Sequence, residues 1–276
     1  MNSTLNIIEP TLRDHTGHCH GYIASLLSVK DMLEPSSYRI WIERGGKKLF
    51  PDHPIQPYFI YKLRKLQLYF LYRRLIKNNE ILFVPTAGML DLRLLSKLLT
   101  RYTNFQGSVH LHFHQFRLTE KKIRQLGHIA RSHPQLHILA PTEPLAAPFI
   151  DAGFSSVSVV PCPVYMPALN QSHTQITATP TLLYTGAART DKGFIEFVEY
   201  LEFALANDMN FPIHVQATPP HNKRYNSLIK PFISRLNTLR SPLLTISDQP
   251  LAQKEYVSLF SNAITMLLYS PDSYHN

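Results

Sequence analysis

The chain has 276 residues, which is enough for one large domain or for two medium-sized domains that each bury a core. With 44% hydrophobic and 17% charged residues, the composition is that of a globular protein, and no apolar run is long enough to span a bilayer. The net charge of +9 favours an anionic partner, which could be nucleic acid, an acidic membrane surface or a phosphorylated small molecule.

Short apolar or β-branched runs alternate with helical segments in the first half of the chain, which predicts a parallel sheet covered by helices. The expected strands are residues 5–10, 38–43, 80–85, 108–114, 136–141 and 157–163.

The first residues lack the basic and apolar regions of a secretory signal, so we expect a cytoplasmic protein. The two cysteines, Cys19 and Cys162, are too few for a disulfide scaffold, and we expect reduced thiols.

Residues 166–180 are expected to form a linker, because they are polar, contain two prolines and follow neither the helical nor the strand period. Beyond them the alternation restarts. The expected strands are 181–186, 212–218, 243–248 and 264–270, and the expected helices are 194–205, 223–239 and 252–262. The chain therefore predicts an α/β domain at 1–165 and a second one at 181–276, which we expect to be incomplete because the sequence ends on its fourth strand.

The segment 181–193, TLLYTGAARTDKG, predicts a strand that ends at Gly186, a loop with Arg189 and Lys192, and a helix that Gly193 opens. Glycines let backbone N–H groups approach an anion, a helix N-terminus adds partial positive charge, and two cations neutralise a diphosphate. The pattern favours a phosphate-binding turn. An ordinary turn with two solvated cations would show the same pattern.

This segment resembles the start of the C-terminal domain in retaining glycosyltransferases of family 4, also called group 1, which have the GT-B fold. In that family a strand is followed by Gly-Arg and then by Lys-Gly, and the Arg and Lys contact the donor diphosphate. Gly186, Lys192 and Gly193 match this spacing. Ala187 stands at the usual Arg position, and Arg189 is the nearest arginine. The resemblance implies two Rossmann-like domains and a donor diphosphate site in this turn.

Three further stretches are similar to the same family. Residues 141–164 resemble its late N-terminal-domain segment, in which a helix with a Ser/Thr-Glu start leads to a strand. Residues 9–22 resemble the glycine-containing loop after its first strand, near which donor and acceptor meet. Residues 110–116 resemble the place where family members end a strand with a functional histidine. The resemblance therefore covers most of the chain.

Ligands in open α/β sheets bind beyond the carboxyl ends of the strands, and this rule favours the same residues. We expect His114, the last residue of its strand, to act as the catalytic substrate contact. The loop with His15, Gly17 and His18 is expected to shape the sugar and acceptor side of the site.

His110, His112 and His114 alternate along one strand and would share one face, as metal ligands might. No carboxylate or thiol lies nearby in the sequence, and three histidines on a parallel strand would be an unusual zinc site. We therefore expect His110 and His112 to pack or hydrogen-bond within the protein, and we predict no metal site.

Residues 58–79 contain six Lys or Arg and no acidic residue, and their apolar positions approximate a helical stripe accompanied by aromatic side chains. One interpretation is a helix that covers the sheet and exposes a basic face. The other is a helix that lies on an anionic membrane, with aromatics at the level of the headgroups. Many GT-B enzymes act on lipid-linked acceptors, which favours a membrane surface as an additional partner.

The leading prediction is a cytoplasmic glycosyltransferase that moves a sugar from a nucleotide diphosphate donor to a glycan or lipid-linked acceptor, without a cofactor. Family members carry a pair of glutamates beyond the strand equivalent to residues 264–270, and this sequence stops before them. The alternative is therefore a truncated, non-catalytic homologue that binds a glycan, a lipid surface or a partner enzyme. We expect no nucleic-acid partner, because no helix-turn-helix, zinc spacing or RNP-like strand occurs.

Overall fold

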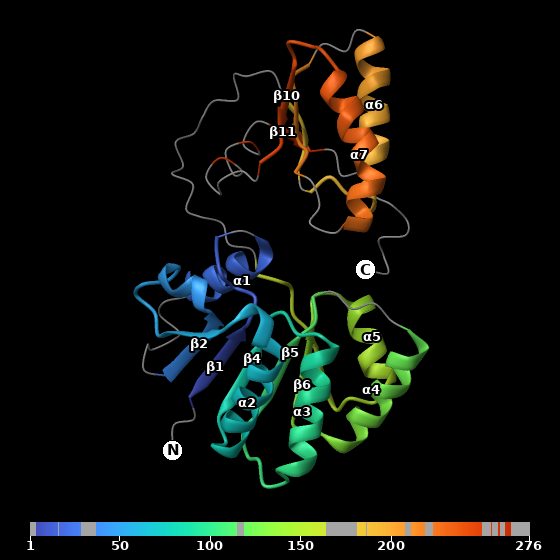
Figure 1. Ribbon diagram of the computed structural model, residues 1–276. Coiled ribbons are helices and arrows are strands. Elements are labelled where there is room, and N and C mark those ends of the chain that lie inside the picture. The colour runs from blue at the N-terminus through green and yellow to red at the C-terminus, as the bar shows by residue number, and fades with distance from the viewer. Residues whose placement is uncertain are drawn as a thin grey trace. The chain divides into compact units, whose positions relative to one another are not determined.

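The computed structural model describes residues 4–15, 17–28, 37–114, 119–163, 181–185, 187–207, 211–218, 223–249, 255, 259 and 263–265. The chain divides into two compact units, Met1–Met166 and Pro167–Asn276. Each unit is built on a parallel sheet with helices packed against it (Figure 1). The expected linker at 166–180 lies outside the described residues.

The N-terminal unit contains a seven-stranded parallel sheet with the order β3-β2-β1-β4-β5-β6-β7. Its strands are β1 (Leu5–Glu9), β2 (Tyr38–Glu43), β3 (Ile55–Phe59), β4 (Ile81–Val84), β5 (Val109–His112), β6 (Leu136–Ala140) and β7 (Ser156–Val159). Its helices are α1 (Gly17–Ser28), α2 (Arg64–Lys77), α3 (Met89–Arg101), α4 (Glu120–Ser132) and α5 (Glu143–Asp151), with short helical turns η3 (Arg44–Lys48) and η4 (Tyr61–Leu63). Each of the six expected strands is present within a few residues of its predicted bounds.

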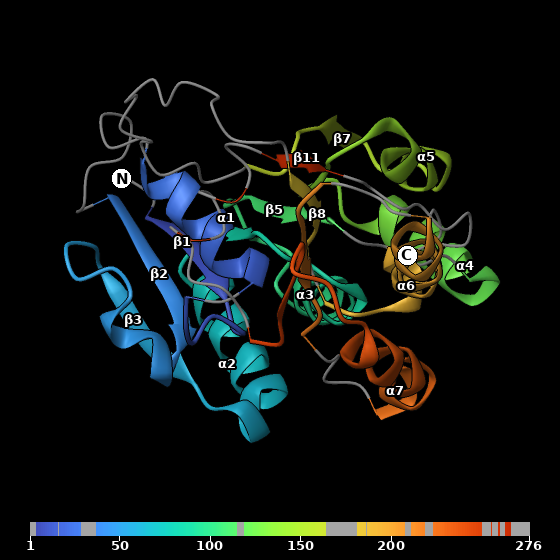
Figure 2. The ribbon, with the colours of Figure 1, turned by 90° about the horizontal axis from the view of Figure 1, so that it is seen from above.

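Successive residues of the central strands enter two different hydrophobic layers. Ile8 and Trp41 pack in the layer that includes α2, α3 and α4. Ile7 and Ile40 pack in the layer that includes α1. Figure 2 shows α1 and α2 on opposite sides of β1 and β2. Because the sheet is covered on both sides there, its strands read as continuous apolar runs, which explains why the sequence indicated them clearly.

The segment 58–79 is not the single helix that its pattern predicted. Its first two residues end strand β3, η4 follows, and α2 begins only at Arg64. The sequence pattern missed β3 because Pro57 lies inside it, and proline is tolerated there because β3 is at the edge of the sheet.

The expected apolar stripe of this segment is divided between two surfaces. Leu71 and Leu75 are buried against the sheet, together with Tyr72. Leu66 and Phe70 instead have 55% and 50% of their surface exposed. Among the described residues, no helix combines the length and the apolar character that crossing a bilayer would need.

The C-terminal unit contains a four-stranded parallel sheet with the order β10-β9-β8-β11. Its strands are β8 (Thr181–Tyr184), β9 (Ile213–Gln216), β10 (Leu244–Ser247) and β11 (Ala263–Thr265), and its helices are α6 (Phe194–Ala206) and α7 (Lys223–Thr238), with the short turn η5 (Thr190–Lys192). Of the expected helix at 252–262, only Glu255 and Leu259 are described, and both are helical. The expected strand at 264–270 is described only as far as Thr265.

The core of the C-terminal unit forms because α6 is amphipathic. Phe194, Phe197, Val198 and Leu201 recur at helical spacing, and all four are buried. They pack with Tyr184 of β8 in one hydrophobic cluster. This packing fixes the start of α6 relative to the carboxyl end of β8, where the diphosphate site was predicted.

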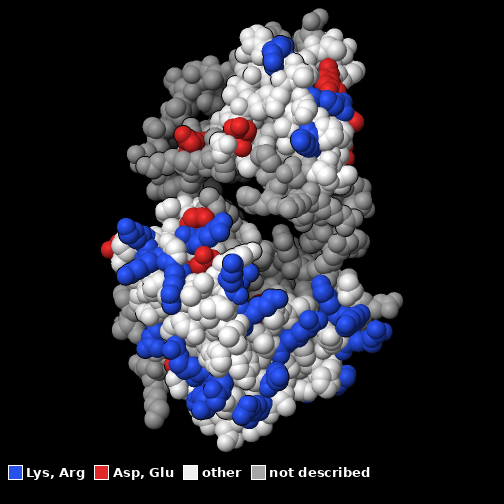
Figure 3. All heavy atoms as spheres, viewed as in Figure 1, with Lys and Arg blue, Asp and Glu red and all other residues white. Residues whose placement is uncertain are grey.

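The net charge of the chain is concentrated in one unit. The N-terminal unit holds 20 Lys and Arg against 11 Asp and Glu, whereas residues 167–276 hold eight of each kind, so the whole excess of +9 belongs to the N-terminal unit. Figure 3 shows Lys and Arg side chains over the face of that unit that carries α2, α3 and α4.

Candidate functional site

A buried carboxylate organises the carboxyl edge of the first sheet. Glu9, the last residue of β1, is fully buried. Its carboxylate accepts hydrogen bonds from the hydroxyl groups of Thr11 at 2.6 Å and Thr86 at 2.5 Å. A buried carboxylate needs such donors, because an unpaired one is costly. Glu9 thereby ties the loop after β1 to the loop after β4 and holds the segment that leads into α1.

His114 lies at this edge, just after β5, as predicted. Its half-buried ring is 4.5 Å from the ring of His18 on α1, measured between centroids. Its Nδ1 atom is buried and has no hydrogen-bond partner among the described residues. Burial, followed by the neighbouring His18 and His112, lowers the pKa of His114 to about 4. At neutral pH the ring is uncharged, and it offers one ring nitrogen to a ligand.

The two predicted histidines of the loop and helix have different neighbours. His18 lies against His114, whereas the exposed His15 lies 3.1 Å from His20, measured from Nδ1 to Nε2. Burial, followed by His15, lowers the pKa of His20. Gly17 is the first residue of α1. The structure therefore brings His18 and His114 together and gives His15 a partner of its own.

His110 and His112 pack within the protein, as expected. His112 Nδ1 lies 2.5 Å from the hydroxyl oxygen of Tyr22, a bond that holds α1 against β5. The ring of His110 stacks on His137 at 4.6 Å, and its Nε2 lies 3.0 Å from the hydroxyl oxygen of Ser108. In the part of the chain that the structure describes, no group of three or more potential ligands could hold a metal ion.

Both cysteines are free thiols, as predicted. Cys19 Sγ lies 3.3 Å from the hydroxyl oxygen of Thr11. Burial and the negative charge of Glu9 raise the pKa of Cys19 to about 11, so the group is a neutral thiol rather than a nucleophilic thiolate.

Glu9 was not predicted as a member of the site. The sequence feature that could have identified it is a carboxylate at the end of an otherwise apolar strand.

The predicted diphosphate turn connects β8 to α6 in the C-terminal unit. Lys192 ends η5 and is exposed, and its carbonyl accepts a hydrogen bond of 3.2 Å from the hydroxyl of Tyr184. Gly193 has a φ of 66°, a left-handed conformation that glycine adopts without strain. It allows the chain to reverse between η5 and α6. Arg189 precedes η5 and is half-buried, and Gly186 lies outside the described residues.

The turn uses several of its own backbone donors. The N–H groups of Lys192 and Gly193 bond to the carbonyls of Arg189 and Thr190, and the N–H of Phe194 bonds to Arg189 as well. We expected the glycine N–H groups to approach an anion, but the N–H of Gly193 is already engaged. What the turn offers an anion is the positive charges of Lys192 and Arg189 and the positive end of α6.

A polar group at the neighbouring strand was not predicted. Ala187 forms an isolated bridge with Thr218, which follows β9, and the N–H of Ala188 donates to the carbonyl of Thr218 at 2.9 Å. The hydroxyl of Thr218 is buried and has no hydrogen-bond partner among the described residues. Thr218 is therefore a further candidate contact at the carboxyl edge of this sheet.

The lowered pKa of His114 predicts a dependence of stability on pH. The unfolded chain binds a proton near the ordinary histidine value of 6.5, and the folded chain does so only near 4, so stability should fall as the pH drops between these values. His114→Gln should reduce this slope. Uptake of one full proton on unfolding would give a slope of about 1.4 kcal/mol per pH unit. Because the ring is half-buried and partly screened, the reduction should be smaller than this.

Urea unfolding at pH 7, 5.5 and 4.5 measures this effect. His128→Gln is the control, because His128 is an exposed residue of α4 outside this cluster. Equal slopes for His114→Gln and the unmodified chain would show that His114 takes up its proton normally in the folded state.

Comparison with known proteins identifies the fold. No protein-family model matches the sequence, and no match was found among curated proteins. A glycosyltransferase from Rickettsia africae is similar in structure, with a TM-score of 0.61 and 13% identity over 95% of this chain and 71% of that chain. HepE from Anabaena, solved with UDP and glucose, has a TM-score of 0.54 and 12% identity, covering 88% and 68% of the two chains.

A putative UDP-N-acetylglucosamine 2-epimerase from Listeria monocytogenes has a TM-score of 0.56 and 12% identity, covering 96% of this chain and 74% of that chain. Identities this low show the fold alone. The chain has the predicted GT-B fold with Rossmann-like domains. The narrower assignment to family 4 stays a prediction.

Proposed function

We propose that the chain binds a nucleotide diphosphate sugar and transfers the sugar to a glycan or lipid-linked acceptor. The observation that carries this proposal is the β8–α6 turn of the GT-B fold. There Lys192 is exposed at the carboxyl edge of a parallel sheet, immediately before the N-terminus of α6. HepE, one of the proteins with a similar fold, was solved with UDP and glucose, which supports a nucleotide-sugar donor.

The chemistry of such a transfer depends on the departing diphosphate. Negative charge grows on the diphosphate as the bond to the sugar breaks, and fixed positive charges beside it lower the barrier. Lys192 would supply a full charge, Arg189 a second one, and the first turn of α6 a partial charge. These groups would act by position and charge, without forming a covalent bond to the substrate.

The edge of the N-terminal sheet would position the sugar or the acceptor. With a pKa of about 4, His114 is a weak proton acceptor at neutral pH, so we assign it to orienting a hydroxyl group through Nδ1, which has no partner among the described residues. His18 packs against the same ring and would fix its orientation. Glu9 would act indirectly, by holding the loops through Thr11 and Thr86.

Calorimetric titration of the full chain with UDP-glucose, UDP-N-acetylglucosamine, GDP-mannose and ADP-glucose tests the proposal. We expect saturable binding of at least one donor and much weaker binding of the matching monophosphate, because the diphosphate makes the principal contacts. Release of the nucleoside diphosphate in the presence of acceptor glycans or lipids would then show transfer. If no donor binds, the proposal is wrong for this chain.

The same experiment also tests two other functions. The structural similarity to a putative epimerase favours, as a second candidate, conversion of a UDP-sugar to its epimer without an acceptor. Product analysis of the donor by chromatography separates the two reactions. Donor binding without turnover would support the non-catalytic alternative.

We also propose that η4 and α2 contact an anionic membrane surface, where a lipid-linked acceptor would be found. Tyr61, Leu66 and Phe70 have 67%, 55% and 50% of their surface exposed, and the exposed Lys62 and Lys65 lie between them in the sequence. Apolar and aromatic groups beside cations are the combination that binds at the interface of an acidic bilayer.

Leu66→Glu/Phe70→Glu should strongly reduce co-sedimentation with phosphatidylglycerol-rich vesicles at low salt. Each substitution replaces an apolar group at the interface with a charge that the lipid repels. The control is Phe203→Glu/Leu228→Glu, at two exposed apolar positions of the C-terminal unit with 68% and 54% exposure. A chain that does not sediment with these vesicles, or a control that loses binding equally, would contradict the proposal.

A further inference from the structure

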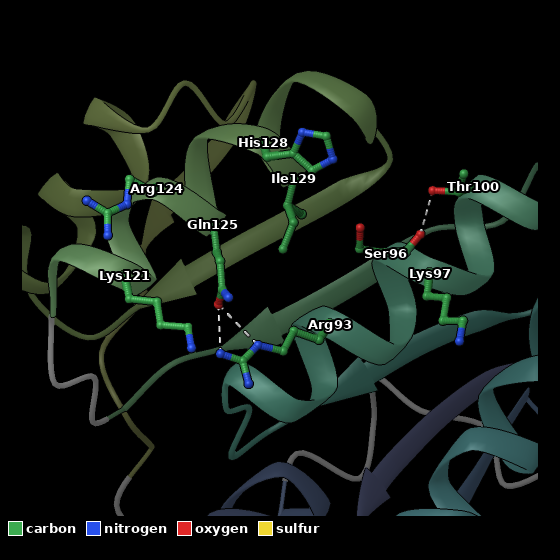
Figure 4. Close-up of a pocket in the computed structure, with 9 residues that line it drawn as sticks. All are labelled: Arg93, Ser96, Lys97, Thr100, Lys121, Arg124, Gln125, His128 and Ile129. Atoms are coloured by element: carbon green, nitrogen blue, oxygen red, sulfur yellow. Dashed lines mark hydrogen bonds between the residues drawn. The ribbon is translucent and has the colours of Figure 1, made fainter.

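A basic hollow lies between α3 and α4 in the N-terminal unit, and its described lining residues include none of the site residues discussed above. Its volume is about 630 Å³, and the described residues that line it all belong to these two helices. Four of the lining side chains are cations, Arg93 and Lys97 from α3 and Lys121 and Arg124 from α4, and no Asp or Glu is among the lining residues that the structure describes. Figure 4 shows the side chain of Lys121 extending from α4 toward the guanidinium group of Arg93.

Helical spacing aligns these cations along facing stripes. Arg93 and Lys97 are four residues apart on α3, and Lys121 and Arg124 are three apart on α4, so each pair lies on one side of its helix. The opposite sides of both helices are apolar and buried in the same core. Like charges that face one another across such a gap repel.

The stretch of sequence that contains both helices has few acidic residues. Residues 61–131 contain 14 Lys and Arg against three Asp and Glu, and one of these acids, Asp91, is buried and bonded to Tyr72. Among the described residues, no carboxylate pairs with Arg93, Lys97 or Lys121. An anion in the hollow would replace this repulsion with attraction.

One lining residue is held in place before any ligand arrives. Oε1 of Gln125 on α4 accepts hydrogen bonds from Nε and Nη2 of Arg93, at 3.2 Å and 2.7 Å. A neutral amide thus orients the guanidinium without cancelling its charge. A preoriented arginine loses less freedom on binding, and Arg93 can present its remaining N–H donors, on Nη1 and Nη2, to a phosphate.

We propose that this hollow binds a ligand with a multiply charged phosphate group, either a diphosphate or a phosphomonoester. A single carboxylate would neutralise one of the four cations, whereas a diphosphate or a doubly charged phosphomonoester offers several charged oxygens to both helices at once. The volume lies in the range of small-ligand pockets, roughly 300–1,000 Å³. A soluble polyphosphate and the phosphate headgroup of a lipid share this chemistry.

Calorimetric titration of the full chain with inorganic pyrophosphate tests the proposal. Lys97→Glu/Lys121→Glu should weaken binding by at least about 10-fold, because two charge-assisted contacts become repulsive. The matched control is Lys47→Glu/Lys48→Glu, two exposed residues of η3 that change the net charge by the same amount. The hollow variant should be at least as resistant to urea as the control, since it relieves repulsion between α3 and α4.

Lys192→Ala separates this site from the proposed donor site, because pyrophosphate binding at the hollow should persist in that variant. Loss of all pyrophosphate binding in Lys192→Ala would assign it to the β8–α6 turn and overturn the inference. Equal weakening in the hollow variant and the control, or no saturable binding by the unmodified chain, would do the same.

Binding to vesicles of phosphatidic acid and of phosphatidylglycerol, matched in surface charge, distinguishes a lipid headgroup from a soluble polyphosphate as the ligand. A preference for phosphatidic acid that the hollow variant loses would indicate a phosphomonoester headgroup. Binding of pyrophosphate alone would indicate a soluble ligand, and either result supports the site. A single-stranded oligonucleotide that binds more tightly through the same lysines would overturn the ligand class.

Discussion

Lys192→Ala should weaken the binding of a nucleotide diphosphate sugar by about 10- to 100-fold, or about 1.4–2.7 kcal/mol. The side chain is exposed, so its removal leaves no cavity in the core. The backbone N–H of Lys192 and the carbonyl that bonds to Tyr184 remain, so the turn itself should persist. The loss should therefore appear in the affinity for the diphosphate rather than in the stability of the fold.

Calorimetry with the preferred donor and with its monophosphate checks this prediction. The variant should lose affinity for the diphosphate compound and little for the monophosphate. Lys230→Ala, which removes another exposed lysine of the same unit, should change neither affinity. Lys192→Arg should retain most of the binding, since it keeps the charge. Full affinity in Lys192→Ala would remove the main support for the proposed donor site.

Local patterns predicted the parts of the fold that depend on local sequence. The buried strands read as apolar runs, and the β8–α6 turn was located because glycine, lysine and a helical period occur within a few residues of each other. His114 was predicted as the last residue of its strand, whereas β5 ends at His112 and His114 follows it at the same edge of the sheet. Strand β3 was missed because Pro57 interrupts the pattern, a residue that only its edge position permits.

Contacts between distant residues could not be read from periodicity. The bond from Thr86 to Glu9 joins residues 77 positions apart, and the contact between Tyr22 and His112 spans 90. Both depend on which strands become neighbours in the sheet, and this order is not encoded in any one segment. The division of the 58–79 stripe has the same origin, because burial of an apolar residue on α2 depends on whether β3 or solvent lies beside it.

The basic hollow also became visible only in three dimensions. In sequence, Arg93 and Lys121 belong to two separate helices that each show an ordinary solvated basic face. The crossover connections on either side of β5 place α3 beside α4. Two ordinary basic helix faces therefore combine into one region of concentrated positive charge. Net charge alone indicated an anionic partner, and the structure shows which surface gathers the charge.

Tyr72→Phe should destabilise the N-terminal unit by about 1–3 kcal/mol, although only one oxygen atom is removed. The hydroxyl of this fully buried tyrosine donates to Oδ1 of Asp91 at 2.7 Å. Oδ2 of Asp91 accepts from the N–H of Gly88 at 2.9 Å and so caps α3 at the carboxyl edge of the sheet. Without the Tyr72 hydroxyl, the buried Asp91 carboxylate keeps its desolvation cost and loses one hydrogen-bond donor.

The dependence of this loss on pH identifies its cause. Burial already raises the pKa of Asp91, and losing the Tyr72 hydrogen bond, which lowers it, should raise it further in the variant. The folded variant then binds a proton at a higher pH than the unmodified protein does. The difference in unfolding free energy should therefore be greatest near neutral pH and shrink as the pH falls.

A double-mutant cycle with Asp91→Asn isolates the role of the charge. The asparagine carbonyl can accept one of the same hydrogen bonds without a charge, so Tyr72→Phe should cost less in the Asp91→Asn background than in the unmodified chain. Urea unfolding of the four proteins measures the coupling. An equal cost in both backgrounds would mean that the loss comes from the packing of the ring and not from the bond to a charged Asp91.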